Sequence, residues 1–417
     1  MSYRPRIIDG VLARRLGSSG AVLLEGPKAC GKTFTAMQHT SSQVYLDTNP
    51  AALAALAVDP GLVLNGTPPQ LVDEWQLAAT QVWNHVRAEV DRRATPGQFV
   101  LTGSAVPDDD ARRHTGAGRF ARLTMRPMSL VESGLSTGEM SLAALLAGGR
   151  PTSPDPGLRV PDIADAVVRG GWPLNLSLSL DDAAQSNIDY LRTIAEVDIA
   201  RLDTARRDPA RALRFLQALA RHVAMELKVS RIVTEADGAD GPIARTTAYD
   251  YLNALRRLMV LDELTPWATH LRSRAVLRTA SRVHLADPSL GAAALGASPA
   301  RLLADLNTLG LLFESLVVRD ARVYAEPLGA TVHHYRDSDD LEVDVIVQTR
   351  SGPWGAFEVK LGTAQVDEAA HRLLRFAEKV DTDKVGTPAV LAVVTASGYG
   401  YTRPDGVVVV PIGTLGP

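Results

Sequence analysis

The stretch Gly26-Pro27-Lys28-Ala29-Cys30-Gly31-Lys32-Thr33 decides the fold of this chain. It follows a short apolar run, Ala21–Glu25, and precedes a helical segment, Thr33–His39, which is the strand–loop–helix order of a phosphate-binding loop. Glycine lets the backbone N–H groups of such a loop turn toward phosphates, while Lys32 reaches the terminal phosphates and Thr33 offers its hydroxyl to Mg²⁺. The stretch is a complete Walker A motif, so we predict that all eight residues contact ATP or ADP.

Apolar runs and helical segments alternate beyond this loop. Further strands are predicted at Val44–Asp47, Gln70–Asp73 and Gln98–Thr102, with a helix at Gln81–Arg93. Strands that alternate with helices indicate a parallel α/β sheet. The sequence around the loop therefore predicts a P-loop α/β domain.

An acidic pair, Asp73-Glu74, ends the apolar strand about forty residues after the Walker A motif. In a P-loop ATPase the first carboxylate of such a pair holds Mg²⁺ and the second polarises the attacking water. We therefore predict Thr33 and Asp73 as Mg²⁺ ligands and Glu74 as the catalytic carboxylate. Thr102-Gly103-Ser104 follows the next strand and is either a sensor of the γ-phosphate or an ordinary strand end.

Composition narrows the class of protein. The chain has 417 residues, a net charge of −3 and a single cysteine, Cys30, which excludes an internal disulfide and a cysteine-rich zinc site. It has neither an apolar run of about 18 residues, as a membrane helix needs, nor an apolar signal core at its N-terminus. We expect a cytoplasmic protein that does not enter a membrane. Six of the 44 basic residues are lysines, so a lysine within a motif is less often incidental.

Three domains are predicted. Residues 1–150 form the ATPase domain, closed by a Gly- and Pro-rich linker at Gly148–Gly157. Residues 158–270 are dominated by helical patterns. Residues 271–417 return to strands mixed with helices, which indicates a second α/β domain.

The helical region contains a pattern typical of a winged helix. Two helices, Ser230–Ala236 and Thr246–Leu258, precede an apolar segment, Val260–Pro266. A winged helix reads DNA with its second helix, and many such modules contact proteins instead. Arg256 and Arg257 are the main basic residues here, so nucleic acid and protein both remain candidate partners.

The order of several phrases resembles a bacterial and archaeal family of AAA-type ATPases. Members of that family carry a C-terminal domain of unknown function with a restriction-endonuclease-like core. The matching phrases are Gly26–Thr33, Asp73-Glu74-Trp75-Gln76, Leu101-Thr102-Gly103-Ser104, Gly118-Arg119, Gly170-Gly171-Trp172-Pro173, Glu342-Val343-Asp344-Val345 and Glu358-Val359-Lys360. They span nearly the whole chain. Lys28-Ala29-Cys30 and Ala105 depart from the family pattern, and neither removes a side chain that must contact phosphate.

The resemblance implies a catalytic role for Arg119. In AAA-type ATPases an arginine, supplied by a neighbouring subunit or by the same chain, neutralises charge on the transferred phosphoryl group. Arg122 and Arg126 are rivals for this role, and a plain surface arginine is the alternative. An arginine acting between subunits requires a homo-oligomer.

Asp344 lies fourteen residues before Glu358-Val359-Lys360, the spacing of the PD-(D/E)xK nuclease core. In that core two carboxylates on adjacent strands bind a divalent cation, and the lysine activates water. Alternation along a strand places Glu358 and Lys360 on one face, and Glu314 matches a supporting acid on the preceding helix. We therefore predict a second divalent-cation site, in a domain that either cleaves nucleic acid or serves as a binding scaffold.

The predicted fold is an AAA-type P-loop domain with a parallel sheet, a helical and winged-helix-like region, and an endonuclease-like α/β domain. The predicted function is Mg²⁺-dependent ATP hydrolysis that powers or gates the C-terminal domain. One alternative is a nucleotide-regulated, metal-dependent nuclease that acts on DNA or RNA. The other is an ATP-switched signalling or scaffold protein without nuclease activity.

Overall fold

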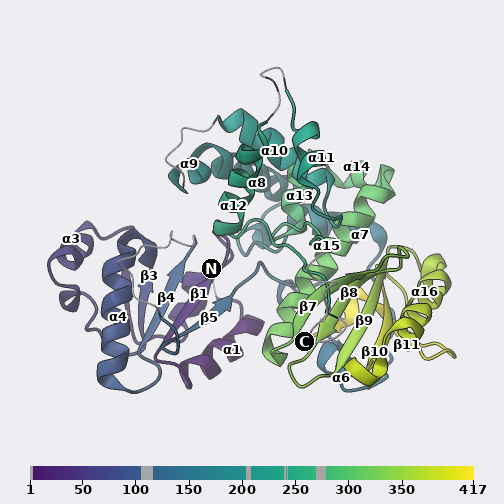
Figure 1. Ribbon diagram of the computed structural model, residues 1–417, viewed down its shortest axis with the longest axis horizontal. Helices are drawn as coiled ribbons and strands as arrows, with labels where there is room; N and C mark the ends of the chain where they lie inside the picture. Colours follow the sequence, from purple (N-terminus) through teal and green to yellow (C-terminus); the bar gives the residue numbers. More distant parts are fainter. Residues whose placement is uncertain (1–2, 105–115, 203–207, 239–240, 242, 269–278) are drawn as a thin grey trace. The chain divides into compact units, whose positions relative to one another are not determined.

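The computed structural model describes residues 3–104, 116–202, 208–238, 241, 243–268 and 279–417 (Figure 1). Ala105 and the predicted boundary between residues 270 and 271 lie outside these residues. The chain forms two compact units. Unit 1 comprises Met1–Pro127 with Arg257–Met259, and unit 2 comprises Met128–Arg256 with Val260–Pro417.

The chain divides at Pro127 and not at the predicted residue 150. The short strand β6 (Met140–Ser141) pairs in parallel with β13 (Leu415–Gly416). Ser136 Oγ also donates to Leu415 O at 2.7 Å. The sequence just after Pro127 therefore folds with the C-terminal end of the chain. The helical region and the C-terminal sheet likewise belong to one compact unit and not to two.

Unit 1 is built on a five-stranded parallel sheet in the order β2-β3-β4-β1-β5. Its strands are β1 (Ala21–Glu25), β2 (Ser42–Tyr45), β3 (Gln70–Asp73), β4 (Phe99–Gly103) and β5 (Phe120–Thr124). Every residue of β1, β3 and β4 is buried, as expected for parallel strands covered on both faces. The predicted parallel α/β sheet is confirmed, with strand ends shifted by one or two residues.

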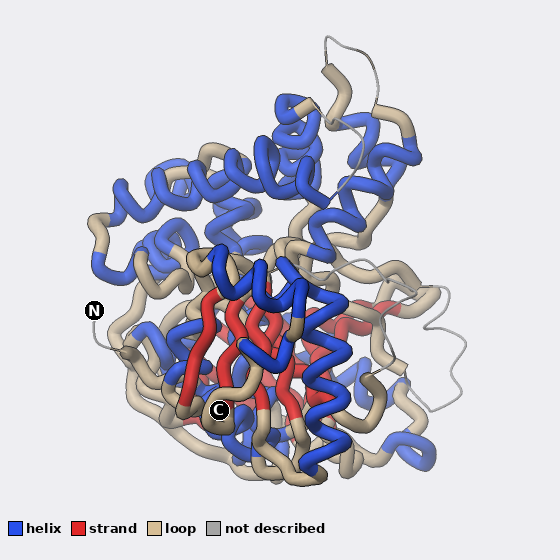
Figure 2. Tube along the Cα trace, turned by 90° about the vertical axis from the view of Figure 1, so that its left-hand side faces the viewer, coloured by secondary structure: helices blue, strands red, loops and turns tan. Residues whose placement is uncertain are grey.

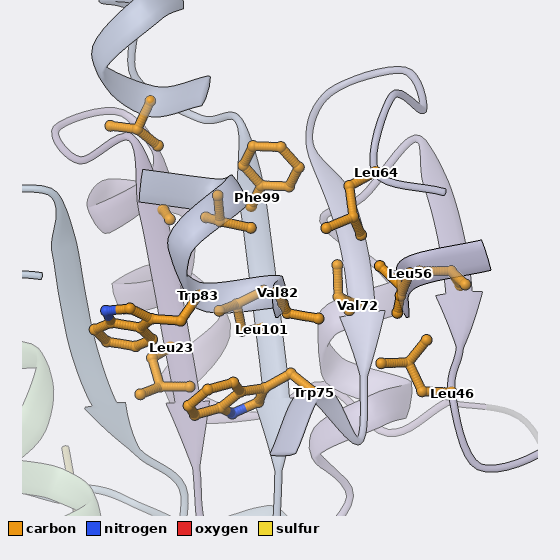
Figure 3. Packing of buried hydrophobic residues seen from close by; sticks show 14 of the residues in the cluster. Leu23, Leu46, Leu56, Leu64, Val72, Trp75, Val82, Trp83, Phe99 and Leu101 are labelled. Atoms are coloured by element: carbon orange, nitrogen blue, oxygen red, sulfur yellow. The ribbon is translucent and has the colours of Figure 1, made fainter. Parts of the chain in front are cut away.

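Helices cover this sheet, and Figure 2 shows some helices in front of strands. The helices of unit 1 are α1 (Ile7–Leu16), α2 (Lys32–Met37), α3 (Pro50–Val58) and α4 (Ala79–Arg93). Figure 3 shows the apolar core on one face, where Leu23, Val72 and Leu101 of the strands meet Val82 of α4. Trp83 stacks on Phe120 with ring centroids 4.0 Å apart. This core fixes the positions of the strands whose carboxyl ends carry the site.

Unit 2 begins with a mainly helical part. Its helices are α5 (Leu130–Ser133), α6 (Leu142–Leu146), α7 (Val160–Arg169), α8 (Leu180–Thr193), α9 (Ile199–Leu202), α10 (Pro209–Arg221), α11 (Val229–Glu235), α12 (Arg245–Arg257), α13 (Pro288–Ala294), α14 (Pro299–Ala304) and α15 (Leu306–Ala325). A π-helical turn, Ile194–Asp198, continues α8. No helix among the described residues combines the length and apolar composition needed to cross a bilayer.

The two helices of the predicted winged helix are present as α11 and α12. The apolar segment after them forms isolated antiparallel bridges, Leu261 with Leu285 and Leu264 with Arg282. Arg256, one of the two main basic residues of this module, donates to both carboxylate oxygens of Glu263 at 2.7 and 2.8 Å. Its charge is therefore balanced within the module, and the winged helix stays a prediction.

The C-terminal part of unit 2 contains a six-stranded mixed sheet in the order β11-β12-β10-β9-β8-β7. Its elements are β7 (Thr331–Arg336), β8 (Glu342–Gln348), β9 (Trp354–Lys360), α16 (Val366–Lys379), α17 (Thr382–Val385), β10 (Val390–Thr395), β11 (Tyr401–Thr402) and β12 (Val408–Pro411). β7, β8 and β9 pair antiparallel, whereas β9, β10 and β12 pair in parallel. Trp267, Trp354 and Phe376 lie in the core between this sheet and α16.

A buried ion cluster joins distant segments of unit 2. Arg319 of α15 donates to Asp287 Oδ2 at 2.8 Å and to Asp320 Oδ1 at 2.7 Å. The same two carboxylates accept backbone N–H groups, Asp287 from Gly171 and Asp320 from Leu130, each at 3.0 Å. The cluster therefore ties α15 to the segment that directly follows unit 1.

Candidate functional site: a phosphate-binding loop and two carboxylate clusters

The Walker A stretch forms a loop between β1 and α2. Gly31 has φ 105° and caps α2 at its N-terminus, and Ala29 also has a positive φ of 61°. A Cβ atom on Gly26 would lie 2.2 Å from the carbonyl oxygen of Met125, so only glycine fits there. The loop thus has the close backbone packing and the helix N-terminus that a phosphate site needs.

Lys32 lies folded across this loop. Its Nζ donates to Gly26 O at 2.9 Å and to Pro27 O at 2.8 Å, and the side chain is buried. Both acceptors belong to the loop itself. The ammonium is therefore held where it can exchange a loop carbonyl for a phosphate oxygen.

Thr33 and Asp73 meet at the carboxyl ends of the strands. Thr33 Oγ1 lies 3.0 and 3.2 Å from the two carboxylate oxygens of Asp73. The hydroxyl of Thr102, which pairs with Asp73 in the sheet register, donates to the same carboxylate. A hydroxyl and a carboxylate at one edge of a parallel sheet are ligands that Mg²⁺ prefers, so these residues fit the predicted ion.

Glu74 follows Asp73 in a left-handed conformation, with φ 53° and ψ 42°. Its carboxylate accepts from Gln76 Nε2, and Ser104 Oγ lies 3.4 Å from Oε2. Burial raises the pKa of Glu74, and Asp73 adds to the rise while Lys32 opposes it. The side chain of Ser104 therefore contacts the predicted catalytic carboxylate, a role the sequence did not indicate.

Arg6 is a residue of this site that the sequence did not reveal. Its buried guanidinium donates to Cys30 O from Nη1 and to Arg126 O from Nη2, both at 2.8 Å. It thus links the Walker A loop to the segment after β5. No local motif marks this arginine, because its acceptors are backbone carbonyls far along the chain.

The position of Arg119 argues against its predicted catalytic role at the nucleotide site of the same chain. Arg119 immediately precedes β5, and its carbonyl accepts from Ala21 N at the amino end of β1. The loop follows the opposite end of β1, about 13 Å away at roughly 3.3 Å per residue. Its guanidinium pairs with Asp91 of α4 at 2.9 Å. Arg119 therefore does not reach its own nucleotide site, and a role in a neighbouring subunit stays a prediction.

The two rivals of Arg119 differ in position. Arg122 lies within β5, and its Nη1 is 3.4 Å from Glu25 Oε1. The backbone carbonyl of Arg126 is bound by Arg6. Arg122 thus lies inside the strand, whereas Arg126 follows its carboxyl end.

The second predicted site, in unit 2, does bring its four residues together. Lys360 Nζ lies 3.0 Å from Glu358 Oε2 and 3.8 Å from Asp344 Oδ2. Arg282, which the sequence did not single out, joins Glu314 and Asp344, with Nη1 at 2.8 and 3.3 Å from their oxygens. The predicted carboxylates are thus neighbours of two cations.

Burial dominates the electrostatics of this cluster. It raises the pKa of Glu314 and that of Glu358 to about 8, and Asp344 contributes to both shifts. Glu358 Oε1 is buried and has no hydrogen-bond partner among the described residues. Within the part of the chain that the structure describes, no three His, Cys, Asp or Glu side chains are grouped to hold a metal ion. The predicted second cation therefore lacks a ligand set here.

Comparison with known families covers the first of these sites. Residues 18–133 match the family model described as an AAA domain. Most of unit 1 is therefore similar to an AAA domain. The match covers the Walker A loop and Asp73-Glu74, and it supports ATP binding at the level of the family.

The remainder of the chain matches families without an assigned activity. Residues 160–301 match a domain of unknown function, DUF8612, and residues 309–415 match another, DUF4143. An endonuclease-like core after the AAA domain is therefore not shown by these matches.

Two uncharacterized relatives are similar to this chain over most of its length. Uncharacterized proteins of Mycobacterium bovis and Mycobacterium tuberculosis are each 27% identical over 408 residues, 96% of this chain and 82% of the relative. A Walker-type ATPase of Pyrococcus abyssi aligns over 70% of this chain and 99% of its own, with 11% identity and a TM-score of 0.38.

Proposed function

We propose that this protein binds ATP with Mg²⁺ and hydrolyses it at the AAA domain, with Glu74 as the carboxylate that activates water. The observation that carries the proposal is the contact of Thr33 with Asp73 at 3.0 Å. It joins the end of the Walker A loop to the acidic pair on β3, so the two motifs form one site.

Each side chain has a distinct role in this reaction. Lys32 would neutralise the terminal phosphates, and Thr33 and Asp73 would hold Mg²⁺, which would supply further positive charge against the phosphates. The raised pKa of Glu74 makes its ionised form a stronger base toward water. Gln76 and Ser104 orient this carboxylate through their contacts with it.

Hydrolysis is further proposed to gate unit 2 through the connection at Pro127. The thiol of Cys30 in the Walker A loop lies 3.6 Å from Met125 O. Three residues further along the chain, Met128 N donates to Gly171 O at 2.6 Å, and Leu130 N donates to Asp320 of α15. A shift of the loop on loss of the γ-phosphate would therefore act on a segment bound to α15.

For unit 2 the contacts favour an ATP-switched scaffold over a nuclease. In support of a nuclease, the antiparallel strands β7–β9 followed by α16 and parallel β10 place Asp344 beside Glu358 and Lys360. Against it, Arg282 and Lys360 already bind these carboxylates. A cleavage assay with Mg²⁺ or Mn²⁺ on single- and double-stranded DNA and on RNA decides between the two, and we expect no cleavage.

The test of hydrolysis is Glu74→Gln. We expect it to bind ATP like the wild type and to slow turnover by on the order of 10²-fold or more, because it removes only the general base. Lys32→Ala should instead weaken ATP binding. Glu89→Gln is the matched control, since Glu89 of α4 pairs with Arg92 and Arg93 away from the loop. Wild-type turnover in Glu74→Gln would refute the assignment.

A further inference from the structure

Arg282 is the centre of a carboxylate cluster in unit 2. Its side chain is 5% exposed, and Nη1 lies 2.8 Å from Glu314 Oε1 and 3.3 Å from Asp344 Oδ1. Nη2 lies 2.8 Å from Glu342 Oε2. One planar guanidinium thus binds carboxylates from α15 and from β8, in the fork geometry that arginine offers.

Two further oxygens of the cluster, one on Asp344 and one on Glu358, also face donors. Asp344 Oδ2 accepts Val359 N at 2.9 Å and lies 3.8 Å from Lys360 Nζ. Glu358 Oε2 binds Lys360 at 3.0 Å, with Arg372 at 3.8 Å. Both oxygens of Asp344 are therefore engaged. A divalent ion would need these lone pairs at about 2.0–2.6 Å.

We propose that the guanidinium of Arg282 is the permanent cation of this cluster and takes the place of a divalent metal between Glu314, Glu342 and Asp344. Arginine stays protonated in proteins and has no lone pair to offer a metal. The cation is also part of the chain, so it meets these carboxylates at a high effective concentration. The inference holds whether or not the AAA domain hydrolyses ATP.

The protonation of the cluster agrees with this assignment. Burial raises the pKa of Glu314 and of Glu358 to about 8, and Asp344 adds to both shifts. Ionised carboxylates are therefore costly at this buried place unless a cation lies beside them. Arg282 lowers the pKa of Glu314 and Lys360 lowers that of Glu358, so these two side chains supply the positive charge that the carboxylates need.

The carboxylates of the cluster can be reached from solvent, so the proposed exclusion of a metal ion does not depend on a closed site. A cavity of about 440 Å³ opens beside the cluster, and its lining includes Arg282, Glu314, Glu342 and Asp344. Ions in solution can reach these oxygens, so the guanidinium itself must keep them away. Shortening Arg282 to alanine leaves three carboxyl groups facing one space. The variant Arg282→Ala should therefore gain a metal site that the wild type lacks.

The test measures Mn²⁺ binding to the full chain without nucleotide, by electron paramagnetic resonance and by thermal melting. Asp73→Asn is the background, because it removes the carboxylate ligand of the AAA domain. We expect no bound Mn²⁺ and no Mn²⁺-dependent rise in melting temperature in Asp73→Asn. Adding Arg282→Ala should give one bound Mn²⁺ per chain and a melting temperature that rises with Mn²⁺ concentration.

Three outcomes decide the matter. The proposal would be overturned if the Asp73→Asn protein, with Arg282 intact, bound Mn²⁺ and the additional change Asp344→Asn abolished that binding. A folded Asp73→Asn/Arg282→Ala protein that binds no Mn²⁺ would also overturn it, since removal of the cation should free the oxygens. Gain of one Mn²⁺ that Asp344→Asn abolishes supports it. Glu74→Gln should leave all these results unchanged, which separates this proposal from that of hydrolysis.

Discussion

Replacement of Arg319 by methionine should destabilise unit 2 strongly. The arginine side chain is 4% exposed, and the carboxylates of Asp287 and Asp320 that it binds are fully buried. Methionine is unbranched, and it fills much of the space while removing the charge. Arg319→Met therefore leaves two carboxylates in a buried site without a cation, and one or both must take up a proton for unit 2 to fold.

The magnitude follows from the burial. Removal of one partner from a buried ion pair costs about 3–5 kcal/mol, because the other charge stays desolvated. Asp287 keeps the backbone N–H donors of Gly171 and Ser289, and Asp320 keeps the backbone N–H of Leu130 and the Tyr324 hydroxyl, which limits the cost. The free energy of unfolding of a domain is about 5–15 kcal/mol. A loss of 3–5 kcal/mol is thus a large share of it and corresponds to a melting temperature lower by about 10 °C.

Urea unfolding followed by tryptophan fluorescence measures this loss. Arg192→Met is the control, because Arg192 and Asp189 are both 59% exposed and 3.6 Å apart, a pair that contributes under about 0.5 kcal/mol. A second variant, Arg319→Met with Asp287→Asn and Asp320→Asn, should recover part of the stability by removing the stranded charges. A loss below about 1 kcal/mol for Arg319→Met would refute the role assigned to the cluster.

Three further predictions concern single side chains. Arg6→Met should raise the KM for ATP, because the buried carbonyl of Cys30 in the Walker A loop loses its donor at a cost of about 1–3 kcal/mol, and the loop loses its link to Arg126; unchanged ATPase kinetics would contradict it. The pKa of Glu358 is raised from its ordinary value of 4.5 to about 8 in the folded protein, so the protonated side chain favours folding. The folding stability gained in this way is fully present below about pH 4.5 and is lost as the pH rises to about 8. Glu358→Gln should remove this pH-dependent loss of stability. If the free energies of unfolding of the wild type and the variant change in parallel between pH 6 and 8.5, the prediction is wrong. Arg119→Ala should leave the ATPase turnover of dilute monomer unchanged, as measured by phosphate release. When Arg119→Ala subunits are mixed with Glu74→Gln subunits at a concentration that allows assembly, the mixture should be more active than either variant alone only if Arg119 acts between subunits.

Three strands of unit 1, β1, β3 and β4, were predictable because they are buried along their whole length. β1, β3 and β4 are covered on both faces, so their sequences are nearly continuous apolar runs that stand out from their surroundings. Parallel strands also carry their carboxyl ends to one edge. The neighbouring positions of Thr33 and Asp73 therefore followed from two local motifs, without any knowledge of the tertiary structure.

The boundary at Pro127 could not be predicted in the same way. It depends on the pairing of β6 with β13, two strands of two residues each, at opposite ends of unit 2 in sequence. Such short strands have no periodicity to recognise. The Gly- and Pro-rich stretch near residue 150 indicated a linker, and the structure shows that it lies inside unit 2.

The two carboxylate clusters show why residue type and spacing did not suffice to predict the second site. Asp73 and Asp344 both lie on sheet strands, and each has a second acid nearby. Asp73 is bound by the hydroxyls of Thr33 and Thr102, and a hydroxyl can rotate to turn a lone pair toward an incoming cation. Asp344 is bound by the guanidinium of Arg282, which has no lone pair and keeps its charge. Arg282 lies 62 residues from Asp344, so no local pattern reveals the pair. On these two proposals, the donor opposite each carboxylate, more than the carboxylate itself, accounts for Mg²⁺ at the loop of unit 1 and for arginine at the sheet of unit 2.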